Sequence, residues 1–497
     1  MDLPRRLSTG SSSGESSPIL SNYNSSTSLI LVHDDEEPAS PFDFPDDDED
    51  IPESPEFEIR RHFSPPMAPS LVFLYLLSPY LKLGALLLPN TQLPLEYGIL
   101  PLFVFAVLSA FSRQIWYMLA RYMRKADLED IILDAFALGR GKEGRRTWLR
   151  NIVRGGTGSL RLLLSVIYLR ESVHIILPLL PADLPLPPRP VLTVVFASAL
   201  LPLVSAQSLS SRRIVYVTWA SIATYIIWFL CVAVAHANGT LEINPGWLRM
   251  GTFWQGLTTT AFAFTSSSTL PLYASLKAGA PPAALSKSSL SRSFRTLSTM
   301  SVVVAVCFTL PLVFFTAHMN VVILQDPPLL RLQPAITIFN SLTLLLAIPS
   351  VLVTTPSLPI PERIRHATTI PLSKYLTFTL AIVLSLVPTR IARILSDVLI
   401  ASACASTFFL PALVHITTHF FKRPLSIIMP QMPSTPNPHV HEPLPAAADE
   451  LLQRKERALQ KRQFRKRVVW DVGVWVLLLP VGGGGFVWGA GRLAGRW

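Results

Sequence analysis

Charged residues are scarce in this sequence, since Asp, Glu, Lys and Arg together make up 15% of the chain. Soluble proteins carry roughly a quarter charged residues, so the composition excludes an ordinary soluble domain. Cysteine is scarce as well, with three residues, Cys231, Cys307 and Cys404, each inside an apolar block. That pattern excludes a disulfide framework and a cysteine metal site. We also expect no cleavable signal peptide, because the N-terminal region lacks an apolar core followed by a small-residue cleavage site.

Nucleic-acid binding and catalysis are both disfavoured. The net charge is +11, but the basic residues lie between apolar blocks, where membrane orientation places them. No basic face with interleaved aromatic residues is evident, so no nucleic-acid partner is expected. A membrane enzyme such as an acyltransferase would need an intramembrane His or Asp pairing and a reactive constellation at the interface. None stands out, so we expect no enzyme, no cofactor and no catalytic residue.

Long apolar blocks are what the sequence does contain. Hydrophobic residues make up 50% of the chain. They fall in blocks of about 20 residues, the length that crosses a bilayer as a helix. We predict an all-α integral membrane protein of about eleven spans, with its transmembrane domain at 67–490. The predicted spans are about Met67–Pro89, Tyr97–Arg121, Gly158–Leu180, Pro190–Gln207, Ile214–His236, Thr252–Lys277, Thr299–Asn320, Leu332–Thr354, Ile370–Pro388, Leu395–His415 and Val468–Ala490.

Basic residues set the predicted orientation. Clusters of Lys and Arg follow the even-numbered predicted spans, whereas most of the alternate loops nearly lack them. The positive-inside rule then places the even-numbered loops and the N-terminus in the cytosol. The sequon at Asn238 consequently faces the lumen or the exterior, where we expect it to be glycosylated.

Polar segments flank the spans. Residues 1–66 are rich in Ser, Pro and acidic residues, so we predict a disordered cytosolic tail. Within it, Glu15–Leu20 resembles an acidic dileucine signal that a sorting adaptor would bind, although such short patterns also arise by chance. The cytosolic loop 421–467 ends in the basic run Arg454–Arg467, which is either a helix on the lipid face or a solvated linker. Residues 491–497 form a C-terminal tail.

Two of the predicted spans are interrupted. The first contains the helix breakers Gly84 and Pro89. The sixth contains a run of hydroxyl residues, Thr265–Thr269, followed by Pro271. Hydroxyl side chains can bond the backbone groups that a break frees, so such a span faces protein or a water-filled cavity rather than lipid. A Ser/Thr-rich helix packed against its neighbours is the alternative.

Interrupted helices at the first and sixth positions are typical of transporters built from inverted repeats. The order predicts a five-plus-five arrangement with the substrate site between the breaks. Free N–H groups and unwound carbonyls there suit the carboxylate and amine of a zwitterion. The residues expected to line the site are Gly84, Ala85, Leu86, Thr265, Ser266, Ser267 and Ser268.

Three motifs resemble signatures of the amino acid/auxin permease family. The run Gly84–Pro89 resembles the G-x-x-x-L-P pattern of its first span. Ala261–Leu276 resembles its sixth span, in which an F-x-F pair leads through a polar break to P-x-Y. Ser402–Leu413 resembles its tenth span, where small residues lead to F-x-P-A-L. The resemblance covers about Met67 to Ala490 and implies a secondary transporter that carries amino acids, driven by protons or sodium, with the inverted-repeat fold.

The same resemblance suggests a membrane and reveals two departures. The acidic tail and its dileucine-like pattern resemble vacuolar fungal members, so the vacuolar membrane is expected rather than the plasma membrane. Lys82 lies close to the first break, where the family usually has a second small residue. Ser266–Ser268 stand where many relatives carry a polar ring or amide side chain.

Candidates for ion coupling lie in other spans. Glu171 is the acidic candidate within a span, with Arg170 beside it and His174 one turn on, which would permit a proton relay. A buried or interfacial ion pair, or a position near the lumen, is the alternative. A sodium site would instead combine carbonyls of the first span with Ser341 or Thr343.

The expected function follows from the two breaks and the family resemblance. We expect a proton-coupled amino acid transporter that works by alternating access, with the lipid bilayer and a small amino acid as its partners. The alternative is a transport-inactive amino acid sensor with the same fold. His415 and His419 have the i and i+4 spacing of metal ligands but no third ligand, so no metal site is expected.

Overall fold

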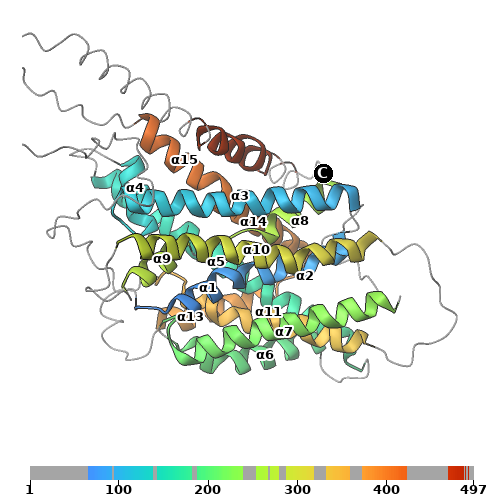
Figure 1. The fold of residues 1–497 in the computed structure, drawn as a ribbon. Helices are drawn as coiled ribbons and strands as arrows, with labels where there is room; N and C mark the ends of the chain where they lie inside the picture. The colour runs from blue at the N-terminus through green and yellow to red at the C-terminus, as the bar shows by residue number, and fades with distance from the viewer. Residues whose placement is uncertain are drawn as a thin grey trace, which may run out of the picture. The chain divides into compact units, whose positions relative to one another are not determined.

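The described residues are helical and contain no β-strand. The computed structural model describes residues 65–91, 95–137, 143–181, 187–206, 208–238, 253–266, 269–278, 287–317, 332–358, 372–421, 470–485, 468, 487 and 491. They belong to one unit, Phe44–Trp497 (Figure 1). The predictions for the acidic tail with Glu15–Leu20 and for nearly all of the loop 421–467 lie outside the described residues.

Seven helical segments of the described chain are long and apolar enough to cross a membrane. They are Pro69–Thr91, Tyr97–Tyr122, Glu143–Leu179, Arg212–Ala237, Ser293–Phe315, Gln333–Val353 and Thr389–His419. Three shorter apolar helices are Pro188–Val204, Leu372–Ser385 and Trp470–Gly483. The chain therefore has the architecture of an all-helical, multi-pass membrane protein, as the long apolar blocks predict.

The first predicted span is interrupted, as its glycine and prolines indicate. Its pieces are α1 (Pro69–Leu77), the 3-10 turn η1 (Ser78–Leu81), α2 (Leu83–Leu87) and the 3-10 turn η2 (Leu88–Thr91). Lys82 separates η1 from α2 with φ −120° and ψ −145°, outside the helical region. Pro79 lies one residue into η1, and its missing N–H weakens the helix at this point.

The sixth predicted span is interrupted as well. It consists of α8 (Phe253–Ala263) and α9 (Thr269–Ala278), and Thr265 and Ser266 between them are not helical. Pro271 lies within the first turn of α9, where the missing N–H has no helical partner to lose. It therefore helps to start the second half of the span.

The remaining spans are long helices, several with an interior proline. They are α3 (Leu95–Tyr122), α5 (Glu143–Ile176) with η3 (Leu177–Leu179), α6 (Pro188–Val204), α7 (Arg212–Ala237), α10 (Lys287–Ala317), α11 (Gln333–Val353) and α13 (Leu372–Ser385). The tenth predicted span continues through α14 (Thr389–Cys404), the π-helical η5 (Ala405–Phe409), α15 (Leu410–Ile416) and the π-helical η6 (Thr417–Phe421). A last π-helical turn, η7, covers Leu477–Gly483.

One helix was not predicted, and two others start earlier than predicted. Helix α10 begins at Lys287 rather than near Thr299. The amphipathic α4 (Leu128–Phe136) lies between α3 and α5; the Asp127 side chain caps it by accepting from the Glu129 N–H at 3.2 Å. Helix α5 begins at Glu143 rather than near Gly158, because its first turns are polar and carry no hydropathy signal.

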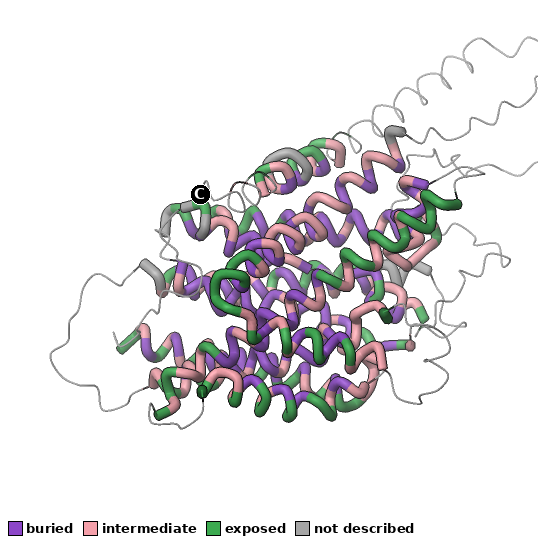
Figure 2. The backbone as a smooth tube through the Cα atoms, turned by 180° about the vertical axis from the view of Figure 1, so that it is seen from behind, coloured by how far each residue is buried: buried purple, intermediate pink, exposed green. Residues whose placement is uncertain are grey.

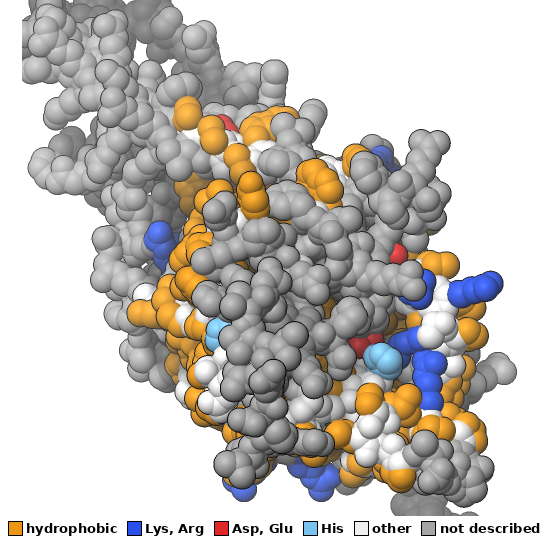
Figure 3. All heavy atoms as spheres, turned by 90° about the vertical axis from the view of Figure 1, so that its right-hand side faces the viewer, with side chains coloured by type: hydrophobic (Ala, Val, Ile, Leu, Met, Phe, Trp, Pro, Cys, Tyr) orange, Lys and Arg blue, Asp and Glu red, His pale blue; other side chains and the backbone are white. Residues whose placement is uncertain are grey.

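Burial separates the broken helices from the surrounding ones. Among the seven candidate spans, Pro69–Thr91 has the largest buried share, 83%. Buried residues gather in the interior, and exposed ones lie along the outer helices (Figure 2). On the face drawn in Figure 3, hydrophobic side chains cover much of the described surface. Exposed apolar side chains such as Val107, Val194 and Val303 suit contact with lipid, whereas the broken helices face protein.

Candidate functional site

The two interrupted helices lie directly against each other. Helix α1 contacts α9, and α2 contacts α8, so the first half of one pairs with the second half of the other. The N–H of Met67 donates to the carbonyl of Ser275 at 3.2 Å at one end of this pair. Near the breaks, a Cβ added to Gly84 would lie 2.3 Å from the Cα of Ala263. Only glycine permits this backbone approach, so the conspicuous Gly84 serves to bring the two breaks together.

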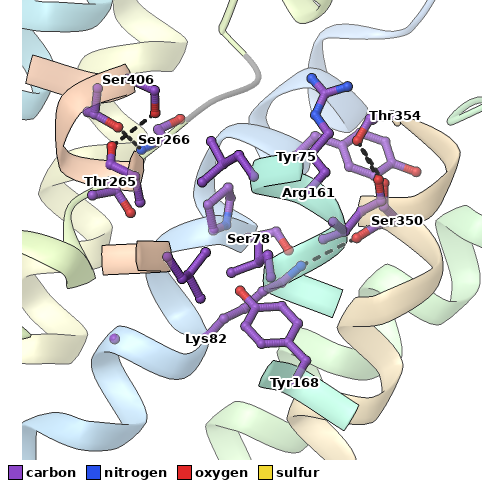
Figure 4. A pocket seen from close by; sticks show the side chains of 18 of the residues that line it. Tyr75, Ser78, Lys82, Arg161, Tyr168, Thr265, Ser266, Ser350, Thr354 and Ser406 are labelled. Carbon is purple, nitrogen blue, oxygen red and sulfur yellow. Dashed lines mark hydrogen bonds between the residues drawn. The ribbon is translucent and has the colours of Figure 1, made fainter. Parts of the chain in front are cut away.

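A cavity of about 100 Å³ lies beside the two breaks (Figure 4). Hydroxyl groups and two cations supply its polar lining. These polar residues are Tyr75, Ser78, Lys82, Arg161, Tyr168, Thr265, Ser266, Ser350, Thr354, Ser406 and Thr407. They come from both broken helices and from α5, α11 and η5.

The predicted substrate site coincides with this cavity in part. Gly84, Thr265 and Ser266 line it. Ala85 and Leu86 are buried in the apolar core and do not line it. Ser267 and Ser268 lie outside the described residues.

Lys82 is a site residue that the sequence marked only as a departure from a family pattern. It lies at the first break, and its side chain is 5% exposed. Its ammonium donates to the Ser350 hydroxyl on α11 at 3.4 Å (Figure 4). A lysine inside an apolar span is itself a signal of function, because an unpaired charge there is costly.

Arg113 on α3 joins the two breaks, and sequence reasoning missed it. Its guanidinium donates to the Leu76 carbonyl at 2.8 Å, to the Ser266 hydroxyl at 2.9 Å and to the Ser301 hydroxyl at 2.8 Å. Its Cζ lies 4.4 Å from the ring centroid of Tyr80 in η1, a cation–π distance. The signal available in the sequence was one arginine within an apolar span, the same signal as for Lys82.

Span 10 satisfies the backbone of the second break. The Ser266 N–H donates to the Thr407 hydroxyl of η5 at 3.1 Å instead of to a carbonyl of its own span. The Ser112 hydroxyl of α3 donates in turn to the Thr407 carbonyl. In a membrane interior every freed backbone group needs such a partner, so these contacts stabilise the interruption.

The proton-relay candidates lie away from the cavity. Glu171 is buried and His174 is exposed, and neither lines the cavity. Glu171 interacts electrostatically with Arg170 and Arg189. Glu171 follows Arg161 by ten positions in α5, which corresponds to about 15 Å along the helix axis. Glu171 thus lies near Arg170 and Arg189 rather than near the broken helices.

The two candidate residues for a sodium site, Ser341 and Thr343, form contacts between helices instead. The Ser341 hydroxyl donates to the Ser172 carbonyl of α5 at 2.8 Å. The Thr343 hydroxyl lies 3.1 Å from the Thr224 hydroxyl of α7. Neither residue lines the cavity; Ser350 and Thr354, further along α11, do so instead.

No metal centre is found in the described part of the chain. The imidazoles of His415 and His419 lie with ring centroids 4.4 Å apart and are tilted by 50°, but no group of three His, Cys, Asp or Glu residues among the described ones could hold a metal ion. Asn238 is exposed at the end of α7. The rest of its sequon lies outside the described residues.

The cavity can hold a small polar ligand between two helices that are both interrupted at that level. Its lining offers hydroxyl groups and two cationic side chains. Compared with models of known protein families and with curated proteins, the chain matches none.

Proposed function

We propose that this protein is a secondary active transporter of amino acids that works by alternating access. One observation carries the proposal: two interrupted helices, paired through Gly84 and Ala263, border a cavity that has hydroxyl and cationic groups in its lining. Interrupted helices of this kind face a cavity rather than lipid, and the hydroxyl and cationic groups that line this cavity suit the charged ends of an amino acid. A purely structural pair of helices would have no need to break twice at the same level.

The placement of the cavity supports a cytosol-facing state. Its lining includes Tyr75 of α1, Arg161 in the middle of α5, where the apolar part of that helix begins, Leu209 just before α7 and Thr354 after α11. These positions lie toward the helix ends that the positive-inside rule assigns to the cytosol. At the opposite level, α2 packs against α8, which closes the cavity on that side.

The proposal includes the number of membrane crossings and the arrangement of the helices in an inverted repeat. The seven candidate spans, the three shorter apolar helices and the pair α8–α9 correspond to the predicted spans one by one, which supports eleven crossings. The antiparallel pairing of the first and sixth spans supports a five-plus-five inverted repeat. We also propose membership of the amino acid/auxin permease family and a vacuolar location, on the motifs given above.

A proton is the coupling ion that the cavity favours. The charged side chains lining it are Lys82 and Arg161, and no described lining residue is acidic. A sodium ion would therefore meet repulsion and no carboxylate ligand. Glu171, near the end of α5, remains the candidate for proton exchange with the lumen that the sequence singled out. Asp397 of α14 is a second buried acid, which the sequence reasoning missed.

Uptake into proteoliposomes tests the transport proposal. The purified chain is reconstituted, and uptake of a radiolabelled amino acid panel is measured with and without an imposed pH gradient. The proposal predicts accumulation that depends on the gradient and not on sodium. Amino acid binding without any uptake would contradict transport and favour a sensor with a transporter fold.

A further inference from the structure

The charged residues that line the cavity beside the breaks are all cationic. Lys82 and Arg161 are its charged lining residues, and no Asp or Glu is found among the described residues that line it. Lys82 comes from the first break, and Arg161 from the middle of α5. In Figure 4 the Lys82 ammonium lies beside Ser350, and the Arg161 guanidinium lies toward the other end of the pocket. A ligand therefore meets two separate cationic groups.

The protein itself satisfies these cations poorly. The Lys82 ammonium has three donors, and its one protein acceptor, the Ser350 hydroxyl, lies 3.4 Å away, which is long for a hydrogen bond. No carboxylate of a described residue forms an ion pair with Lys82 or with Arg161. Because the Lys82 side chain is 5% exposed, water gives it little compensation. A buried cation without an anion is unfavourable, so the site is poised to accept one.

A ligand with carboxylate groups would supply the anions that Lys82 and Arg161 lack. A carboxylate beside Lys82 would form a charge-assisted hydrogen bond in a site of low dielectric, where such bonds are strong. The planar guanidinium of Arg161 suits a second carboxylate through paired N–H groups. The hydroxyl oxygens of Thr265 and Ser266 can accept from a ligand ammonium.

We propose that the cavity selects a small amino acid with two carboxylates over neutral and cationic amino acids. Lys82 binds one carboxylate and Arg161 binds the other. This inference rests on the proposed function, because it names the substrate class of that same site. It gives a role to a lysine at the break, where a side chain without charge would pack at lower cost.

Ligand binding to the full chain in detergent tests the selectivity without requiring transport. Thermal stabilisation is titrated with L-glutamate, its neutral isostere L-glutamine, L-lysine and succinate, which lacks the amine. Wild-type protein should bind glutamate at least about tenfold more tightly than glutamine or lysine, because only glutamate supplies two carboxylates. Lys82→Met should weaken glutamate binding at least about tenfold and reduce the preference for glutamate over glutamine. Lys82→Arg, which keeps the charge, should retain part of the preference.

The matched control is Lys374→Met, the same change at a lysine that donates to the Ala206 carbonyl and does not line the cavity. It should bind like the wild type. Equal binding of glutamate and glutamine by the wild type would overturn the proposal, and this comparison decides even if Lys82→Met fails to fold. Unchanged glutamate affinity in folded Lys82→Met would overturn it too. Succinate binding as tightly as glutamate would overturn the amino acid as ligand.

Transport is read separately in proteoliposomes. Selective glutamate binding without glutamate uptake would support the site and contradict the transport proposal. Uptake of neutral amino acids in preference to glutamate would support transport and contradict the selectivity.

Discussion

The guanidinium of Arg113 donates to the Ser266 hydroxyl at 2.9 Å and, through the same nitrogen, to the Leu76 carbonyl at 2.8 Å. One side chain of α3 thus holds both interrupted helices. Because these contacts lie in the interior of the helix bundle, the arrangement of the breaks depends on a buried charge that water cannot replace.

Replacing Arg113 should therefore weaken the packing of both interrupted helices at once. Arg113→Gln leaves the Leu76 carbonyl and the Ser266 hydroxyl without their charged donor, and we expect a loss of about 3–5 kcal/mol or failure to fold. Arg113→Lys cannot reach all three acceptors and should lower the melting temperature as well. The exposed Arg146→Gln is the control and should melt like the wild type. An unchanged melting temperature in both Arg113 variants would contradict this role.

Gly84 should tolerate no side chain. In Gly84→Ala the new Cβ would lie 2.3 Å from the Cα of Ala263, and backbone cannot move aside as a side chain can. We expect destabilisation of about 1–3 kcal/mol, typical of overpacking, together with loss of uptake. Gly156→Ala is the matched control, since an added Cβ there meets nothing within 4 Å. Wild-type stability and uptake in Gly84→Ala would show that the breaks do not pair as described.

The hydroxyls of Ser341 and Thr343 should matter for stability and not for ions. Their bonds tie α11 to α5 and α7, so Ser341→Ala and Thr343→Val should each cost about 1 kcal/mol in unfolding free energy. Neither change should alter uptake when sodium is exchanged for choline. Sodium-dependent uptake by the wild type that disappears in either variant would restore the sodium site.

Glu171 should affect the driving force rather than substrate binding. Because it lies about 15 Å of helix away from Arg161, Glu171→Gln should leave amino acid affinity unchanged. If this carboxyl exchanges the coupled proton, the variant should lose accumulation driven by a pH gradient and keep exchange of labelled for unlabelled substrate. Gradient-driven uptake at the wild-type rate would exclude Glu171 from coupling.

The sequence predicted the breaks because their cause is local. Pro89 and the hydroxyl run Thr265–Thr269 disfavour a continuous apolar helix whatever surrounds them. Gly84 was expected to break the first span, but it lies inside α2, and the non-helical residue is Lys82, which follows Pro79 by three positions. The sequence did not predict Arg113, Ser350 or Thr354 as site residues. Which face of α3 or α11 meets the breaks depends on how helices rotate against one another, and hydropathy averaged along an apolar span carries little information on that rotation.

Lys82 is another residue whose role in the site could not be predicted from the sequence alone. Its position beside the break was visible in the sequence, but its burial and the absence of an acidic residue from the described cavity lining emerge only from helices far apart along the chain. The polar first turns of α5 and the short α4 were missed because a helix outside the apolar layer gives no membrane signal.

Accessibility of the cavity tests the central claim most directly. Ser406 lines the cavity and bonds only within its own helix, so Ser406→Cys, with Cys231, Cys307 and Cys404 replaced by serine, should preserve the site. Ser341→Cys, buried outside the cavity, is the control that should stay unlabelled. The account predicts that an impermeant thiol reagent labels the Ser406→Cys thiol from the cytosolic side only, and that bound amino acid slows labelling. Labelling that occurs from neither side, or that amino acids do not change, would contradict it.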